Sequence, residues 1–514
     1  MSKQVKRLAK ETVIYGLSNI LSRVLNFIIV TPYLTWKFNN EMGEYGKHGI
    51  MYAYAALLMV VMTYGLETAF FRFGNKPEER DKAFSTAAIS LLVSTVLFVG
   101  ILMLCSRPIA GILLQPQDYN FVLLFALIIG FDVLTAIPFA RLRLENRPIR
   151  FAFYKLMNVL VNVVFLMFFL ELLPYLASRG HEWAGGIYSE DKKLTFVFIS
   201  NVIASIVTFL LLTPMYFRRT APLRKGGETE PGFTFQFDKE LWKKMMWYSM
   251  PLVIVGIAGM ANQMADRYLP KLLLPGSYEE NMIQVGIYNA CVKIAILMSL
   301  FTQAFKFAAE PFFFRHAGEG GSREVYAQVA QAFTFVASIF FLGVMLYLDL
   351  VQFLIASNFR EGLNIVPVLL LAYLVLGVYY NFSIWYKLTD QTKIGAYIAL
   401  AGLVITISLN FFLVPKIGII GAAWAAFACF TFMAVVGFLT GQHFFPVPYR
   451  IGKMLFYVFF AVGIYYLSTL VRPLIGENLI NILLINTLLF GAYLIGVAMV
   501  ERKIVVDAWK GFWK

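Results

Sequence analysis

The sequence predicts an all-helical membrane protein that crosses the bilayer many times and consists of two similar halves. Its 514 residues are 59% hydrophobic and only 14% charged, and its mean hydropathy is +0.70. A soluble chain of this length needs far more polar surface to cover its core. Apolar stretches of about 20 residues recur along the chain, which is the length that a helix needs to cross the hydrocarbon layer.

An internal repeat provides the evidence for two halves. A gapless offset of 243 positions superposes residues 16–72 on residues 259–315. The residues that are identical at this offset are Gly16, Asn19, Pro32, Gly43, Tyr45, Leu57, Glu67, Phe70, Phe71 and Arg72. Two apolar segments share Leu and Phe easily by chance, whereas Glu, Arg, Asn, Pro and Gly are scarce inside apolar helices. We therefore interpret the match as an internal duplication.

Fourteen membrane-spanning helices are expected in chain order. The first six cover residues 12–34, 46–73, 83–105, 121–140, 151–173 and 194–216. The second six cover residues 246–269, 286–307, 326–348, 363–388, 394–414 and 419–442. Helices at 454–471 and 479–500 have no counterpart in the repeat. The expected domains are an N-lobe (1–217), a cytoplasmic connector (218–245), a C-lobe (246–442) and an addition of two helices and a tail (443–514).

The distribution of basic residues predicts the topology. With the N-terminus in the cytoplasm, 31 of the 44 Lys and Arg residues fall near cytoplasmic helix ends and 12 on the opposite side. This asymmetry places both termini in the cytoplasm. Six helices return the chain to its starting side, so the two copies insert in the same orientation and are related by an axis along the membrane normal.

Several functional classes are disfavoured by the composition. The net charge of +14 is explained by basic cytoplasmic loops, so no nucleic-acid partner is expected. Cys105, Cys291 and Cys429 have neither paired nor metal-ligand spacing, and the four histidines are scattered, so we expect no metal and no cofactor. Arg23 lies at the centre of the first apolar run, which is not typical of a cleavable signal peptide.

Polar residues inside the predicted spans are the candidate functional residues. Asn19, Arg23 and Asn26 stack on one face of the first helix because they are spaced three and four apart. The seventh helix repeats this stripe, with Asp266 at the position that corresponds to Arg23. Charged groups at this depth are costly and usually face a cavity or a partner. The candidates for substrate binding are Arg23, Arg267, Lys293, Asn19, Asn26 and Asn262, and those for coupling or gating are Asp132 and Asp266.

Structural alternatives stay open for some of these residues. Small and amide residues also allow membrane helices to pack closely. Lys293 and Asp132 could equally neutralise partners within their own lobes.

Four short segments then resemble a known family. The stretch VGIYNA at 285–290, followed by Lys293, resembles the VGxYxxAxK pattern of polysaccharide flippases, and NFFLVPKIGIIGAA at 410–423 resembles their pattern of Asn, Leu, Pro and GxxGAA. The pair Asp266–Arg267, and Pro138 with Arg143, resemble further positions of the same family. The chain is similar to the polysaccharide (O-antigen unit) flippase branch of the multidrug/oligosaccharidyl-lipid/polysaccharide exporter superfamily.

The resemblance implies two six-helix lobes that work by alternating access. It implies a lipid-linked glycan on an undecaprenyl pyrophosphate carrier as substrate, moved from the inner to the outer leaflet of the bacterial cytoplasmic membrane. Membrane lipids and a glycan polymerase are the expected partners, and the protein is expected to be a monomer and not an enzyme.

Two rival functions are compatible with parts of the sequence. A cation-coupled multidrug exporter on the same fold would use acidic residues, for which Asp132 and Asp266 are the only support. A glycan polymerase or ligase needs a sizeable extracytoplasmic loop with catalytic residues, and the longest such loop, 174–193, has no recognisable arrangement of them. Paired lobes also favour a transporter over an enzyme with one catalytic centre.

Overall fold

The structure is a computed structural model of the chain, and every regular element that it describes is helical. It describes residues 24, 26–75, 77–145, 147–217, 236–316, 322–389, 391–476 and 478–501.

The helices follow one another with few long connections. The first half contains α2 (Thr31–Lys37), α3 (Met42–Thr63), α4 (Leu66–Phe73), α5 (Pro77–Leu104), α6 (Ser106–Leu113), α7 (Tyr119–Leu144), α8 (Pro148–Met167), α9 (Leu173–Ser178), α10 (Glu182–Ile187) and α11 (Lys193–Leu212). The second half contains α12 (Lys239–Leu273), α13 (Tyr278–His316), α14 (Ser322–Leu346), α15 (Leu348–Val351), α16 (Val366–Phe382), α17 (Ile384–Leu388), α18 (Thr392–Ile417) and α19 (Ile419–Phe444). Two final helices are α20 (Ile451–Ile475) and α21 (Leu479–Val500). Shorter π and 3₁₀ segments are η1 (Asn26–Val30), η2 (Pro116–Asp118), η3 (Phe168–Leu172), η4 (Glu190–Lys192), η5 (Thr213–Met215), η6 (Gln352–Leu354) and η7 (Ser357–Ile365).

The protein is a multi-pass membrane protein. Eleven of the described helices are long and apolar enough to cross a membrane, or 12 if the bent pair α3–α4 forms one span. The predicted number of fourteen is not confirmed by this count. Most of the first predicted span lies outside the described residues, and α12, whose Asn262 and Asp266 lower its mean hydropathy, is not among the 11.

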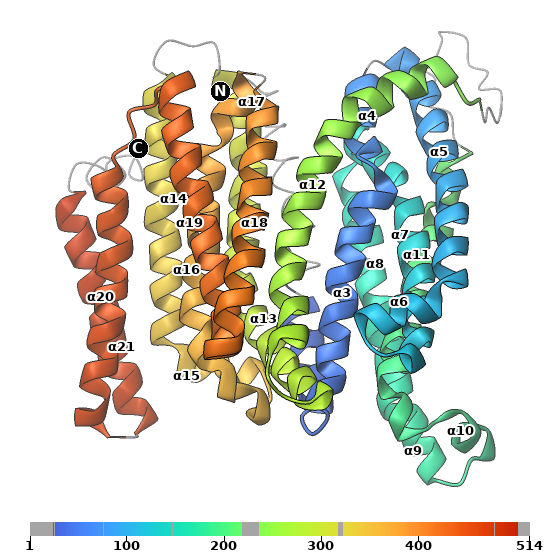
Figure 1. Ribbon diagram of the computed structural model, residues 1–514, viewed down its shortest axis with the longest axis horizontal. Helices are drawn as coiled ribbons and strands as arrows, with labels where there is room; N and C mark the ends of the chain where they lie inside the picture. The colour runs from blue at the N-terminus through green and yellow to red at the C-terminus, as the bar shows by residue number, and fades with distance from the viewer. Residues whose placement is uncertain are drawn as a thin grey trace.

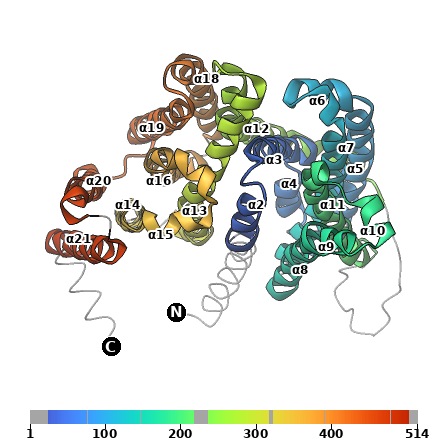
Figure 2. The same ribbon diagram turned by 90° about the horizontal axis from the view of Figure 1, so that it is seen from below.

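The two halves form two groups of helices that lie side by side (Figures 1 and 2). In the first, α7 packs against α3, α5 and α11, and in the second α16 packs against α13, α14 and α19. Adding 243 to the bounds of α5, 77–104, gives 320–347, and α14 spans Ser322–Leu346. Corresponding helices therefore have corresponding neighbours, which supports the predicted duplication.

The helices α20 and α21 lie at the outer edge of the second group, where α20 packs on α14 and α21 (Figure 1). Only 22% of the apolar window of each is buried inside the protein, against 72% for α13. The helix α13 thus lies at the centre of the molecule, whereas α20 and α21 present most of their apolar side chains to lipid.

The second predicted span is broken in the structure. It was expected as one helix over 46–73, but α3 and α4 meet at a bend of 40°. Tyr64 and Gly65 have φ values of 33° and 70° there, and such left-handed conformations end an α-helix. The Tyr64 hydroxyl is held by Ser90 Oγ at 2.6 Å, and a Cβ at Gly65 would lie 3.0 Å from Ser249 Cβ on α12.

The helix α12 begins at Lys239, earlier than the expected start of the seventh span at residue 246. Asp238 caps it by accepting a hydrogen bond from the Leu241 amide at 2.8 Å. Its first turns pack on the first half, where Trp242 Nε1 donates to Ser90 Oγ at 2.8 Å. Farther along, α12 packs against α18 of its own half, so this one helix contacts both groups.

Candidate functional site

The two groups of helices meet most closely where α3 crosses α13. A Cβ at Gly286 would collide with the Met42 carbonyl oxygen, and one at Gly46 would collide with the Met282 carbonyl oxygen. Gly49 lies against the Asn289 side chain. These glycines let the two backbones touch, as small residues do in membrane helix pairs.

Three predicted residues of the second half lie together beside this crossing. Tyr288 donates a hydrogen bond to Asp266 Oδ2 at 3.1 Å, while Asp266 Oδ1 is buried without a hydrogen-bond partner among the described residues. The charge of the adjacent Arg267 acts on Asp266 and on Lys293, and Arg267 also contacts the Tyr373 hydroxyl. The structure thus brings Asp266, Arg267 and Lys293 into one cluster, here called the central charged cluster.

Lys293 differs from the other members of this cluster. Within the described part of the chain its ammonium group has no hydrogen bond and no ion pair. It lies on α13 and is itself partly exposed, whereas its chain neighbours Val292 and Ile294 are buried. A partly exposed cation without a counter-ion can attract an anionic ligand.

An aromatic wall of the first half faces the cluster. His48 is 7% exposed, and its ring stacks on that of Tyr45 at a centroid distance of 5.4 Å. The Tyr52 ring lies tilted to it at a centroid distance of 4.6 Å. The charge of Lys293 acts on the His48 ring, and that of Arg267 acts on Tyr45. The sequence analysis missed His48, because a single histidine near a helix end shows no spacing that links it to a lysine on another helix.

Asp132 lies on the far side of this wall, within the first half. Its Oδ1 accepts a hydrogen bond from Ser205 at 2.8 Å, and its charge acts on Tyr52. Tyr52 is thus a neighbour of both Asp132 and His48, and the contacts described for Asp132 include none with the central charged cluster.

The remaining predicted residues fall in two groups. Asn262 links α12 to its own half, because its amide donates to Cys429 Sγ at 3.1 Å and accepts from Thr406. The amide nitrogen and the amide oxygen of Asn262 therefore both have hydrogen-bond partners within the second half. A role of Asn262 in substrate binding stays a prediction. Asn19 and Arg23, and the side chain of Asn26, lie outside the described residues.

A second link joins the halves near the start of α3 and α13. Lys271 Nζ on α12 donates to the carbonyl oxygens of Ile112 and Leu113 at 3.1 and 3.0 Å. These carbonyls end helix α6, so the lysine caps that helix from the other half. Tyr268 donates to the same Ile112 oxygen at 2.6 Å. Sequence reasoning missed Lys271, which lies just beyond the expected span.

At this end the two groups of helices approach each other, and they diverge toward the end where α12 begins (Figure 1). The described Asp, Glu, His and Cys residues contain no group of three that could hold a metal ion.

Comparisons with known proteins agree with this architecture. The structure is similar to that of the lipid II flippase MurJ in an inward closed conformation, with a TM-score of 0.72 and 15% identity over 96% of this chain and 100% of that one. It is also similar to an inward-facing multidrug resistance transporter of the MATE family, with a TM-score of 0.64 and 11% identity over 86% and 95% of the two chains. At these identities the likeness shows the fold. A search of curated protein sequences gives no match.

A family model describes most of the first half and the start of the second. The model for polysaccharide biosynthesis proteins matches residues 8–316, a range that includes the central charged cluster and the crossing of α3 and α13. The match covers more than half of the chain. The chain therefore belongs to the polysaccharide biosynthesis protein family, on the transporter fold that it shares with MurJ and the MATE transporters.

Proposed function

We propose that this protein is a flippase that moves an undecaprenyl-pyrophosphate-linked oligosaccharide from the inner to the outer leaflet of the bacterial cytoplasmic membrane. The observation that carries the proposal is Lys293, which is partly exposed, lies near Arg267 and, within the described residues, has no counter-ion. A pyrophosphate supplies the missing negative charge. In a medium of low dielectric constant this attraction is several times stronger than in water.

The cluster as a whole suits an anion. Arg267 and Lys293 carry two positive charges against the one negative charge of Asp266, so a net positive charge remains. The guanidinium offers paired donors to phosphate oxygens, while the ammonium acts as a point charge. Arg23, predicted on the first helix, would add a third cation, with Asn19 and Asn26 as neighbouring amides. Asp266 or Asp132 would bind a coupling proton.

The arrangement of the two groups of helices supports a mechanism of alternating access. The positive-inside rule assigns the end where α12 begins to the cytoplasm. The crossing of α3 and α13 and the Lys271 link then close the extracytoplasmic side. Transport requires that the contact between Gly46 and Gly286 opens while the helices converge at the other end, which is the rocking motion of a duplicated transporter.

Replacement of the chromosomal gene tests this function. We expect loss of a surface glycan on deletion, recovery with the wild-type gene, and at least a tenfold lower recovery with Lys293→Gln at equal protein level. Lys416→Gln is the matched control, because Lys416 is exposed and lies 3.7 Å from the Phe412 ring centroid, away from the cluster.

Two outcomes contradict the proposal. Deletion that sensitises cells to cationic drugs and leaves the surface glycans intact would assign the multidrug exporter function instead. Full recovery with Lys293→Gln would remove the anion-binding role of the central charged cluster.

A further inference from the structure

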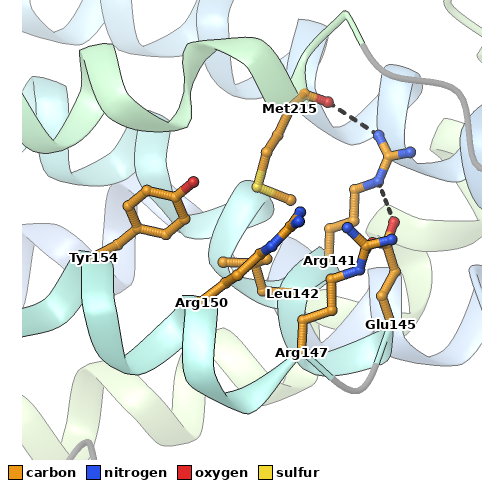
Figure 3. A pocket seen from close by; sticks show the side chains of 7 residues that line it. All are labelled: Arg141, Leu142, Glu145, Arg147, Arg150, Tyr154 and Met215. Carbon is orange, nitrogen blue, oxygen red and sulfur yellow. Dashed lines mark hydrogen bonds and ion pairs between the residues drawn. The ribbon is translucent and has the colours of Figure 1, made fainter.

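A second group of basic residues lies away from the central charged cluster, where α7 ends and α8 begins. Arg141, Arg147, Arg150 and Glu145 line a small pocket of about 20 Å³ together with Leu142, Tyr154 and Met215 (Figure 3). Three arginines and one glutamate therefore line it, and Asp81 pairs with one of the arginines, so one positive charge remains. This pocket, here called the α7–α8 pocket, is not part of the flippase proposal.

The arginines of the pocket differ in how far they are neutralised. Arg141 is 2% exposed and forms ion pairs with Asp81 at 3.0 Å and Glu145 at 2.8 Å. Its Nη1 also donates to the Met215 carbonyl oxygen at 3.1 Å. Arg147 Nε pairs with the second oxygen of Glu145 at 3.0 Å. Glu145 is thus already shared between two arginines.

Arg150 is the uncompensated member. It is exposed, and it makes no hydrogen bond or ion pair with the residues that the structure describes. Figure 3 shows its guanidinium pointing toward Met215 and Arg141, with Tyr154 on one side and Arg147 on the other. The first turn of α8 adds free backbone N–H groups and the positive end of a 20-residue helix.

An apolar stripe starts beside this charge. Ile149, Phe153, Leu160 and Val164 are 77%, 53%, 54% and 53% exposed. Their spacing places them on one face of α8, and Arg150 follows Ile149 directly. An apolar face of this length on a membrane helix is covered by acyl chains.

From these observations we infer that the mouth of the α7–α8 pocket, where Arg150 is exposed, binds the phosphodiester headgroup of an anionic phospholipid, whose acyl chains lie along the exposed face of α8. The pocket supplies the positive charge and the stripe supplies the apolar contact, so the complementary ligand carries an anion and hydrocarbon in one molecule. The positive-inside rule places the pocket at the cytoplasmic leaflet, where basic pockets between helices bind anionic lipids.

The test uses the full-length protein in neutral detergent and titrates phosphatidylglycerol while the midpoint of thermal unfolding is recorded. We expect stabilisation of the wild type and an apparent affinity about fivefold lower for Arg150→Gln, which is the factor expected for one basic residue at an anionic surface. Arg150→Lys is expected to retain most of the affinity. Arg323→Gln on α14 is the matched control, because it removes one exposed arginine from the other half.

Three results would overturn the inference. Equal responses of Arg150→Gln and Arg323→Gln would show that the pocket is not involved. Equal stabilisation by phosphatidylcholine would show that the charge of the lipid does not matter. Stabilisation by inorganic phosphate alone, lost in Arg150→Gln, would assign the pocket to a free anion. None of these measurements depends on transport, so the flippase proposal stands or falls separately.

Discussion

The crossing helices α3 and α13 are copies of one another, yet they carry different chemistry. The offset of 243 lays Gly43 on Gly286 and Tyr45 on Tyr288, so the residues that permit close packing recur in both. It also lays Ile50 on Lys293. Ile50 is fully buried among apolar residues, whereas Lys293 carries a charge into the interface.

The same contrast recurs elsewhere in the repeat. Arg141 corresponds to Ile384, which is 2% exposed in an apolar cluster, and Lys271 corresponds to Ile28, which is 53% exposed. A duplicated scaffold thus sets the backbone paths, while single substitutions decide which copy carries charge. The predictions below compare each charged or tightly packed residue with its counterpart in the other half.

The largest effect is expected at the buried ion pairs of Arg141. Arg141→Met removes one ion-pair partner from Asp81 and one from Glu145, which keeps Arg147, and should lower the free energy of unfolding by about 3 kcal/mol. Ile384→Met at the corresponding position keeps the apolar character and should cost less than about 1.5 kcal/mol. Thermal unfolding of the purified proteins measures both. Similar losses at the two positions would contradict the account of Arg141.

The next effect concerns the backbone contact of α3 and α13. Gly286→Ala places a Cβ against the Met42 carbonyl oxygen, which belongs to the backbone and has little room to move. We expect a loss of about 1–3 kcal/mol from overpacking. Gly43→Ala, its counterpart, places a Cβ at 3.7 Å from Met282 Cβ, which is an ordinary contact.

Cysteine cross-linking between α3 and α13 measures the closed state directly. Cross-linking should fall in Gly286→Ala and stay at the wild-type level in Gly43→Ala. Equal cross-linking in the two variants would show that the glycine contact does not hold this end of the molecule closed.

A smaller effect is expected at the cap of α6. Lys271→Met removes the cation from the carbonyl oxygens of Ile112 and Leu113 and should cost about 1 kcal/mol. Ile28→Met on the exposed counterpart should change stability by no more than about 0.5 kcal/mol. The unfolding midpoint of each variant in the same detergent checks the difference, and equal midpoints would argue against the cap.

The order of the helices could be predicted from the sequence because each apolar stretch is long enough to be recognised. The repeat also shows which helix of the first half corresponds to which helix of the second. Asp266, Arg267 and Lys293 could be named as candidates from the sequence, and the structure places them near one another because the seventh and eighth spans follow each other directly. Their roles stay predictions. The sequence could not show the break at Tyr64, because an isolated Gly65 is common within apolar helices and the contact with Ser249 arises only on packing. The proximity of His48 to Lys293 likewise depends on a crossing of distant segments.

Binding of undecaprenyl pyrophosphate to the purified, full-length protein tests the central claim most directly. If Lys293 attracts the pyrophosphate, Lys293→Gln should weaken binding at least tenfold, and the wild-type affinity should fall as salt is added. Lys416→Gln should bind like the wild type. An affinity that is the same in Lys293→Gln and in the wild type, and that does not change with salt, would contradict the account.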